Sequence, residues 1–258
     1  QLGVILLDRS KKPVIPTEAG LVVIRNARET LKAYNYIKES VSELKGEVAG
    51  TMRLGVIPTV APYLLHRFIP GFVKRYPKVE LEIREMVTSD IVAALNRDML
   101  DAALLAGGTC PDGIVEQELF DDRFYAYVSP SNRLFERSNI RIEDIDQKEL
   151  LLLAEGHCLR DQIVELCQAR RSVRTSCLFE CGSLDTLMRI VDNTSAMTII
   201  PEMATQFIPA ERRCQLKTLA KGAASRKIAI AVRRTYVKGS LVNALKGSIL
   251  NAVGVAAG

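Results

Sequence analysis

The pattern of hydrophobic and polar residues divides the chain into one long helical segment and a longer part in which strands and helices alternate. Over residues 18–45 no proline occurs, and hydrophobic residues recur at steps of three and four. These residues are Ile24, Ala27, Leu31, Tyr34, Ile37, Val41 and Leu44. The spacing predicts a helix with a hydrophobic seam and charged residues on its other faces. Such a seam is typical of a dimerisation helix, and packing against its own domain is the alternative.

Two short hydrophobic segments lie on either side of a basic turn before this helix, in "VILLDRSKKPVIPT". This arrangement predicts a β-hairpin, and Thr17 is placed to cap the helix that follows. The chain starts without a methionine and inside a hydrophobic stretch, so we expect that an upstream segment precedes residue 1.

Beyond an expected hinge at residues 46–50, strand-like segments such as "TMRLGVI" and "LDAALLAG" alternate with helix-like ones such as "SDIVAALNRDM". This alternation predicts an α/β fold of two Rossmann-like lobes. We expect lobe I to comprise residues 47–123 and 232–258, and lobe II residues 124–231. Strands around Tyr125 and Ala229 would cross between the lobes, with a cleft at the carboxyl ends of the strands.

Composition sets limits on the class of protein. The 258 residues are 48% hydrophobic, which is enough for a full core, and six cysteines are too few for a disulfide scaffold. Because the cysteines are sparse and no signal-like segment opens the sequence, we expect a reducing cytoplasm. No hydrophobic run approaches the roughly 18 residues of a membrane helix, so we expect no membrane partner. The net charge of +5 arises after Glu211, because residues 212–258 contain ten Lys and Arg and no Asp or Glu. The charge alone therefore does not indicate nucleic-acid binding.

Two cysteines lie at the ends of a predicted helix in "GHCLRDQIVELCQAR". If the segment is helical, the nine residues from Cys158 to Cys167 place the thiols on opposite faces and about 13.5 Å apart along the axis. A disulfide needs Cα atoms within about 7 Å. The two residues are therefore either buried thiols that never meet or a switch that closes only when the helix unwinds.

The surroundings of the two cysteines differ. Cys158 would lie in the first turn of the helix, where free N–H groups favour a thiolate, and Arg160, and His157 if it is protonated, could add positive charge. Asp161 opposes this trend unless it pairs with Arg160 or Arg233. Cys167, taken alone, is typical of a buried apolar thiol.

The remaining candidates carry weaker signals. Cys110, Cys177, Cys181 and Cys214 have no comparable setting, and the chain has only two histidines, so we expect no metal site and no cofactor. Thr59 follows Pro58 in a loop where a strand is predicted to end. Its hydroxyl can donate and accept a hydrogen bond, although a lone threonine there is usually a cap.

Several segments resemble a known family. "LLDRSKKPVIPTEAG" resembles the wing and start of the linker in LysR-type transcriptional regulators, and "FVKRYPKVELEIREM" and "SAMTIIPEM" are similar to parts of their effector domain. The resemblance implies a wing remnant over residues 1–16, a linker and dimerisation helix over 17–46, and lobes of the periplasmic-binding-protein type. It further implies DNA binding through an upstream helix-turn-helix, a homodimer or tetramer, and RNA polymerase as a partner.

Within that family, "GHCLRDQ" followed by Cys167, and "GVIPTVAPYLL", are similar to the peroxide-sensing members. This implies that hydrogen peroxide oxidises Cys158, that Cys167 then forms an intramolecular disulfide with it, and that the remodelled domain alters DNA binding and transcription. Thr59 matches the threonine that holds peroxide. The supporting residues are His157, Arg160, Asp161 and Arg233. Cys177 stands where these members often have histidine, which leaves the role of that position open.

Two other functions fit parts of the pattern. A LysR-type regulator could bind a small metabolite between its lobes, with incidental thiols. A thiol peroxidase would use the same first-turn cysteine, but the hairpin and long helix have no purpose in such an enzyme, so we expect a regulator rather than an enzyme.

Overall fold

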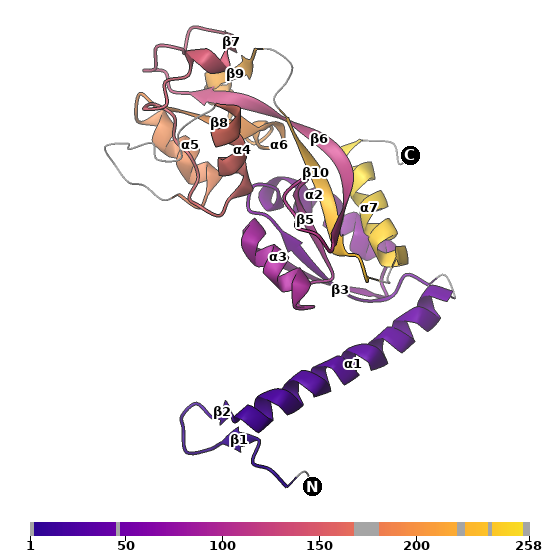
Figure 1. The fold of residues 1–258 in the computed structure, drawn as a ribbon. Helices are drawn as coiled ribbons and strands as arrows, with labels where there is room; N and C mark the ends of the chain where they lie inside the picture. Colours follow the sequence, from indigo (N-terminus) through magenta and orange to yellow (C-terminus); the bar gives the residue numbers. More distant parts are fainter. Residues whose placement is uncertain (1–2, 45–46, 168–180, 221–224, 237–238, 255–258) are drawn as a thin grey trace.

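The structure is a computed structural model that describes residues 3–44, 47–167, 181–220, 225–236 and 239–254 (Figure 1). The predicted hairpin is present, with β1 (Leu7–Asp8) antiparallel to β2 (Ile15–Pro16). The predicted helix is α1 (Glu18–Leu44). Thr17 caps it as expected, because its hydroxyl accepts from the Gly20 N–H at 3.0 Å and donates to the Ile5 carbonyl at 2.7 Å.

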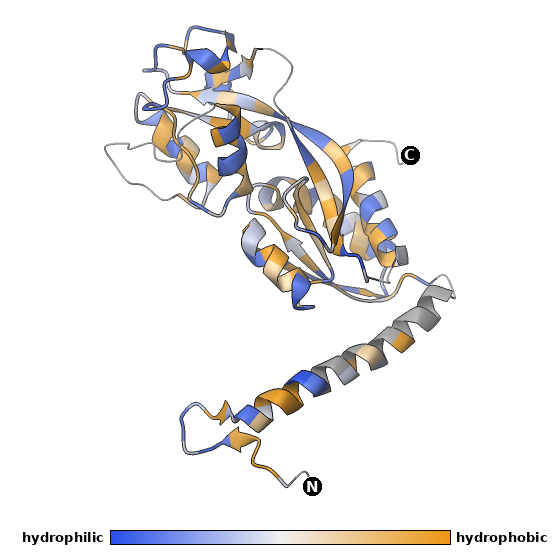
Figure 2. Ribbon diagram, in the orientation of Figure 1, coloured by the Kyte–Doolittle hydropathy of each residue, from blue (hydrophilic) through white to orange (hydrophobic). Residues whose placement is uncertain are grey.

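Figure 2 shows hydrophobic residues along α1, and several of those whose side chains are described are exposed in the single chain. Leu31, Tyr34 and Ile37 are 61%, 55% and 63% exposed. Packing of α1 against its own chain therefore does not cover this part of the seam. The dimer remains a prediction.

Lobe I is built on the parallel strands β3, β4 and β5, in the order β4-β3-β5. Helices α2, α3 and α7 cover the sheet. The bounds are β3 (Gly50–Val56), α2 (Ala61–Arg75), β4 (Val79–Glu85), α3 (Thr88–Asn96), β5 (Ala102–Ala106) and α7 (Gly239–Val253). As predicted, the C-terminal helix returns to this lobe, where Arg67 of α2 donates to the Ala252 carbonyl at 2.7 Å.

Lobe II contains shorter elements around strands β8 and β9. Its elements are β7 (Asn139–Ile140), η1 (Ile142–Asp144), α4 (Cys158–Leu166), α5 (Leu184–Asp192), β8 (Met197–Pro201), α6 (Glu202–Thr205), η2 (Ala210–Gln215) and β9 (Leu216–Leu219). Every residue of β8 is buried, so this strand forms the centre of the lobe II core.

Two long strands connect the lobes, as the sequence predicted. β6 (Ile114–Val128) pairs with β10 (Ser225–Arg233) up to Arg123, and from Phe124 onward it pairs with β8 instead. β10 also pairs with β5 of lobe I over Ile228–Ala231, and the expected lobe boundaries stay a prediction. The change of partner in β6 marks the junction between the lobes.

The hydrophobic run at residues 150–154, expected as a strand, forms two isolated bridges instead. Leu150 pairs with Met197, and Leu153 pairs with Cys181. Because the two ends of the run bond to different partners, no continuous ladder forms. The run nevertheless holds the start of α4 against the lobe II core.

Candidate functional site

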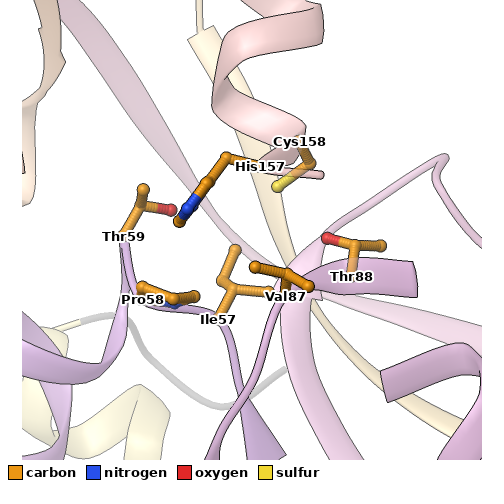
Figure 3. Close-up of a pocket in the computed structure, with 7 residues that line it drawn as sticks. All are labelled: Ile57, Pro58, Thr59, Val87, Thr88, His157 and Cys158. Carbon is orange, nitrogen blue, oxygen red and sulfur yellow. The ribbon is translucent and has the colours of Figure 1, made fainter. Parts of the chain in front are cut away.

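A small pocket lies between the lobes at the carboxyl ends of β3 and β4, where the sequence placed the cleft (Figure 3). It encloses about 140 Å³ of space that protein atoms do not fill, including its open mouth. Three segments line it. They contribute Ile57, Pro58 and Thr59 after β3, Val87 and Thr88 at the start of α3, and His157 and Cys158 at the start of α4. Pockets for metabolites usually measure roughly 300–1,000 Å³, whereas the walls of this pocket leave almost no room for a water-sized sphere, so a metabolite does not fit it as it stands.

Cys158 is the first residue of α4, and His157 is the N-cap. The backbone that leads into α4 passes through Gly156, whose φ of +90° lies in the region that residues with a Cβ rarely adopt. The side chain of His157 does not cap the helix, and in the first turn the Arg160 N–H bonds to the His157 carbonyl at 2.9 Å. The side chain of Cys158 is buried, and Figure 3 shows its sulfur pointing into the space between the two lobes. The predicted position in the first turn is confirmed.

His157 is also buried, and in Figure 3 its ring extends toward Thr59. Burial lowers the pKa of His157 below its ordinary value of 6.5, while the negative charge of Glu85 opposes this shift. The ring is therefore neutral near pH 7. The condition under which His157 would add positive charge near Cys158, a protonated ring, is therefore not met near pH 7.

Thr59 is 2% exposed and is held by Arg226, a residue that the sequence analysis did not select. Arg226 donates from Nη1 to the Thr59 hydroxyl at 2.9 Å and from Nη2 to the Thr59 carbonyl at 3.0 Å. Asp122 in turn accepts from Nε and Nη2 of Arg226 at 3.0 and 2.9 Å. Because the Thr59 oxygen already accepts from Arg226, its own hydrogen is left to donate to a ligand.

Thr88 supplies a second hydroxyl that was missed. Its Oγ1 atom is buried but has no hydrogen-bond partner among the residues that the structure describes. A buried polar atom without a partner is costly unless a ligand or water satisfies it. Since Thr88 lines the pocket, its hydroxyl is available to a small polar molecule there.

Cys167 is the C-cap of α4, so the helix separates it from Cys158 as the spacing predicted. Burial raises the pKa of the Cys167 thiol to about 11, which keeps it protonated and unreactive at neutral pH. The described cysteines, which are Cys110, Cys158, Cys167, Cys181 and Cys214, are all free thiols. Cys177 lies outside the described residues.

The other predicted supporting residues do not line the pocket. Arg160 donates from Nη1 to the Leu153 carbonyl at 2.9 Å, and thereby ties α4 to the preceding segment. Asp161 is exposed in the first turn of α4.

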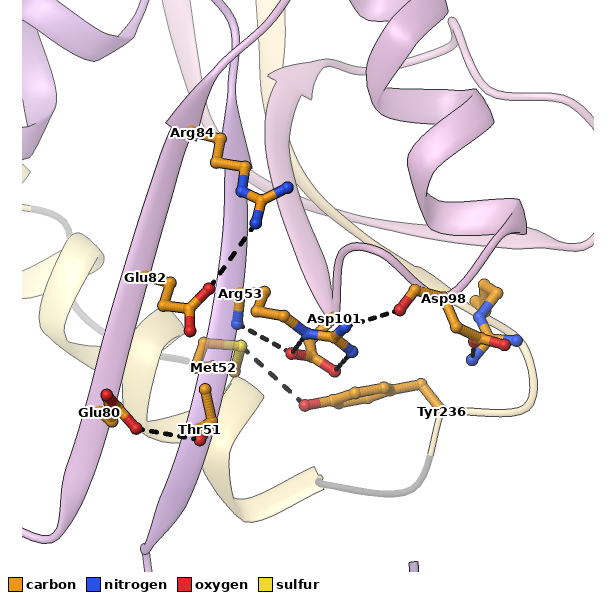
Figure 4. Close-up of polar contacts among 10 residues, drawn as sticks. Thr51, Met52, Arg53, Glu80, Glu82, Arg84, Asp98, Asp101 and Tyr236 are labelled. Atoms are coloured by element: carbon orange, nitrogen blue, oxygen red, sulfur yellow. Dashed lines mark hydrogen bonds and ion pairs between the residues drawn. The ribbon is translucent and has the colours of Figure 1, made fainter. Parts of the chain in front are cut away.

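The structure does not bring Arg233 to the pocket, which corrects that prediction. β10 runs antiparallel to β5, so its end lies at the opposite edge of the lobe I sheet from the pocket. There Arg233 forms an ion pair with Asp98. The Asp98 carbonyl accepts from Nη1 of Arg53 at 2.7 Å, and Arg53 pairs with Asp101 (Figure 4).

A period-two pattern could have revealed the missed arginine and aspartate. Arg226 lies two residues before the buried Ile228, and Asp122 lies two residues before the buried Phe124, so each charged residue is on the buried face of its strand. Charged residues on the buried face of a predicted strand need a partner, which makes them candidates for a shared site. Within the described residues no group of three or more His, Cys, Asp and Glu side chains could hold a metal ion.

Comparison with known proteins identifies the family. Residues 45–253 match the LysR substrate binding domain. The chain belongs to the LysR family of transcriptional regulators. This LysR family member is 35% identical over 213 residues to a hydrogen peroxide-inducible genes activator of Dickeya chrysanthemi, covering 82% of this chain and 68% of the relative. It is 33% identical over 214 residues to the DNA-binding transcriptional dual regulator OxyR of Escherichia coli K12, covering 83% and 68%.

Solved structures of OxyR also resemble this LysR family member. OxyR of Porphyromonas gingivalis superposes with a TM-score of 0.73 at 31% identity, covering 79% of this chain and 93% of that one. A hydrogen peroxide-bound cysteine-to-serine mutant of Corynebacterium glutamicum OxyR gives 0.73 at 29% identity, covering 98% and 80%. The two-lobed α/β fold predicted from the sequence is confirmed. No helix within the described part of the chain is long and apolar enough to span a membrane.

Proposed function

We propose that this chain is the sensing part of a redox-responsive transcriptional regulator in which hydrogen peroxide oxidises Cys158. The observation that carries the proposal is the position of the Cys158 sulfur, which lies at a helix N-terminus in a small pocket with two threonine hydroxyls. A helix N-terminus stabilises a thiolate, which is the form that attacks peroxide. The similarity to peroxide-inducible activators supports the same chemistry.

The first step forms a sulfenic acid. The Cys158 thiolate attacks one peroxide oxygen, the O–O bond breaks, and the other oxygen leaves as hydroxide, which takes up a proton to become water. Thr59 donates to the peroxide with the hydrogen that Arg226 leaves available. The unpartnered hydroxyl of Thr88 and the neutral ring of His157 complete the polar lining.

The second step forms a disulfide with Cys167. The Cys167 thiolate attacks the sulfur of the sulfenic acid, the S–O bond breaks, and hydroxide leaves to become a second water. This step requires α4 to unwind, because its nine residues hold the cysteines about 13.5 Å apart along the axis. Unwinding also exposes Cys167 to water and returns its pKa from about 11 toward the ordinary thiol value. The opening that brings the thiols together therefore also activates the second one.

We infer that the rearranged lobe changes the arrangement of a dimer joined through α1, with tetramers formed by additional contacts between lobes. Through the linker helix this would alter an upstream DNA-reading domain and its action on RNA polymerase. The reducing cytoplasm suits such a sensor, because its thiols must be restored after each response.

Counting free thiols tests the proposal. With peroxide below one equivalent, each peroxide consumed removes two thiols, and peptide mapping finds Cys158 joined to Cys167. The variant Cys158→Ser is expected to lose no thiols, whereas Cys214→Ser, which removes an exposed thiol far from α4 in sequence, responds normally. An unchanged thiol count in the unsubstituted chain contradicts the proposal and favours the metabolite-binding regulator. Sustained peroxide consumption with thioredoxin and its reductase, at peroxidase rates, favours the enzyme instead.

A further inference from the structure

We propose that Asp122 is a positioning residue for the reaction of Cys158 with peroxide, acting through Arg226 on Thr59. This inference rests on the proposed function. Asp122 does not line the pocket, so any effect of Asp122 on the reaction is transmitted through the side chains of Arg226 and Thr59.

The first argument is the geometry of the buried pair. Asp122 and Arg226 are directly opposite each other in the ladder of β6 and β10, and both side chains are fully buried. The carboxylate accepts from Nε and Nη2 of the guanidinium, which fixes the plane of this group. With that plane fixed, Nη1 and Nη2 reach the hydroxyl and the carbonyl of Thr59. The orientation of the Thr59 hydroxyl therefore depends on Asp122.

The second argument is that Asp122 connects the two lobes. Its other oxygen, Oδ1, accepts at 3.1 Å from the N–H of Met203, in the first turn of α6 in lobe II. Asp122 itself lies two residues before the point where β6 changes partner from β10 to β8. One carboxylate thus holds the Thr59 loop of lobe I and the start of a lobe II helix in a fixed relation.

The third argument is electrostatic. A guanidinium buried without a counterion is strongly unfavourable, so Arg226 requires Asp122 to remain in the interior. The positive charge of Arg226, in turn, polarises the Thr59 hydroxyl on which it acts and strengthens its donation to the peroxide oxygen that becomes hydroxide. Replacement of the carboxylate by an amide weakens the restraint on Arg226 while keeping the side-chain shape.

The experiment compares two reactions of Cys158 in Asp122→Asn, in a Cys167→Ser background that stops at the sulfenic acid. Trapping of the sulfenic acid gives the rate constant with peroxide, and iodoacetamide gives the rate constant of a reaction that needs no Thr59 hydroxyl. We expect the peroxide rate constant to fall by up to about tenfold, which is the loss expected when the Thr59 hydroxyl itself is removed. The iodoacetamide rate constant is expected to change less than about twofold.

Two further variants separate positioning from a general structural effect. Asp101→Asn is the matched control, because Asp101 binds Arg53 through both oxygens at the opposite edge of the lobe I sheet (Figure 4), and we expect it to leave both rates unchanged. In a Thr59→Val background, Asp122→Asn is expected to have no further effect on the peroxide rate, because the group on which it acts is gone.

Each other outcome overturns the inference. Equal losses in both reactions mean that Asp122 only maintains the fold, and an additive loss in Thr59→Val means that it acts by another route. If Asp122→Asn does not fold, the charge-neutral pair Asp122→Asn with Arg226→Gln takes its place, and an unchanged ratio of the two rates overturns the inference. Failure of the unsubstituted chain to react with peroxide at Cys158 overturns the proposed function as well, whereas normal peroxide reactivity of Asp122→Asn overturns only the role of Asp122.

Discussion

Cys158 and Cys167 occupy opposite ends of the same helix, one as its first residue and the other as its C-cap. Both are free thiols, and the backbone N–H of Cys167 still bonds to the Ile163 carbonyl at 2.9 Å. A disulfide between them is incompatible with this helix, so its formation would convert a local opening into a lasting change of shape.

The first prediction concerns this opening. Oxidation by one equivalent of peroxide is expected to abolish the hydrogen-exchange protection of α4, because the disulfide cannot form while the i to i−4 bonds of the helix persist. Mass spectrometry of peptides covering residues 157–167, before and after peroxide, measures this change. In Cys167→Ser we expect sulfenic acid at Cys158 with the protection of α4 retained. Identical protection in the reduced and oxidised chain would show that another cysteine supplies the second thiol.

The sequence predicted much of this arrangement because the relevant signals are local. Cys158 in the first turn follows from a glycine and a polar cluster before a helical pattern, and the separation from Cys167 follows from helix geometry alone. The capping by Thr17 and the return of the C-terminal helix to lobe I were also predicted. These features depend on neighbours in sequence or on general rules of chain connection.

The features that the sequence analysis missed depend on contacts between distant segments. Arg226 reaches Thr59 across 167 positions, and only the pairing of β10 with β6 decides that Arg226 rather than Arg233 lies near the pocket. The same limit applies to Thr88, whose importance arises from the absence of a partner in the described structure rather than from its sequence. The neutral state of His157 likewise follows from burial, which a motif does not reveal.

The two pocket threonines are expected to respond differently to removal of the hydroxyl. Thr88→Val removes a hydroxyl that has no partner among the described residues, so the free energy of unfolding should be unchanged or slightly higher. Thr59→Val leaves Nη1 of Arg226 without its acceptor and should lower that free energy by about 1–3 kcal/mol. Both variants should slow sulfenic acid formation by roughly tenfold, the equivalent of one hydrogen bond. Denaturant unfolding and stopped-flow kinetics provide the two measurements, and an unchanged rate in Thr88→Val would remove this residue from the site.

Gly156→Ala is expected to destabilise the chain and to slow the reaction with peroxide. The added Cβ would meet Val87 only at ordinary contact distances of 3.8 Å or more, so the cost comes from the backbone φ of +90°. We expect a loss of roughly 1–2 kcal/mol in the free energy of unfolding. Gly71→Ala in α2, where an added Cβ meets nothing within 4 Å, serves as the control and should instead raise stability by about 0.5–1 kcal/mol. Equal changes in the free energy of unfolding for the two substitutions would contradict the claim that the backbone at residue 156 requires glycine.

The lowered pKa of His157 predicts a defined dependence of stability on pH. In the window below the ordinary value of 6.5, the unfolded chain binds a proton at this residue more readily than the folded chain does. The stabilisation that neutral His157 gives the folded chain is therefore complete above about pH 6.5. It is lost as the pH falls through the lower folded-state pKa. Chemical denaturation between pH 7.5 and about pH 5 should show a steeper loss in the unsubstituted chain than in His157→Gln. His66→Gln, which changes an exposed residue of α2, should keep the original slope, and loss of the slope in that variant would contradict the assignment to His157.

The final prediction is that α1 joins two copies of the chain through the seam that the single chain leaves open. Leu31 and Ile37 are exposed by more than three-fifths, which is unusual for large aliphatic side chains at helical spacing in an isolated domain. A carboxylate at either position would have to be buried in the dimer without a designed counterion, and by symmetry the cost arises on both helices. Sedimentation of Leu31→Asp with Ile37→Asp should therefore show a monomer at concentrations where the unsubstituted chain is a dimer. Asn26→Asp introduces the same charge at an exposed position that is not part of the seam, and it should leave the dimer intact. If the doubly substituted chain dimerises with unchanged affinity, the contact must lie on the lobes instead, and α1 would then be a spacer rather than the interface.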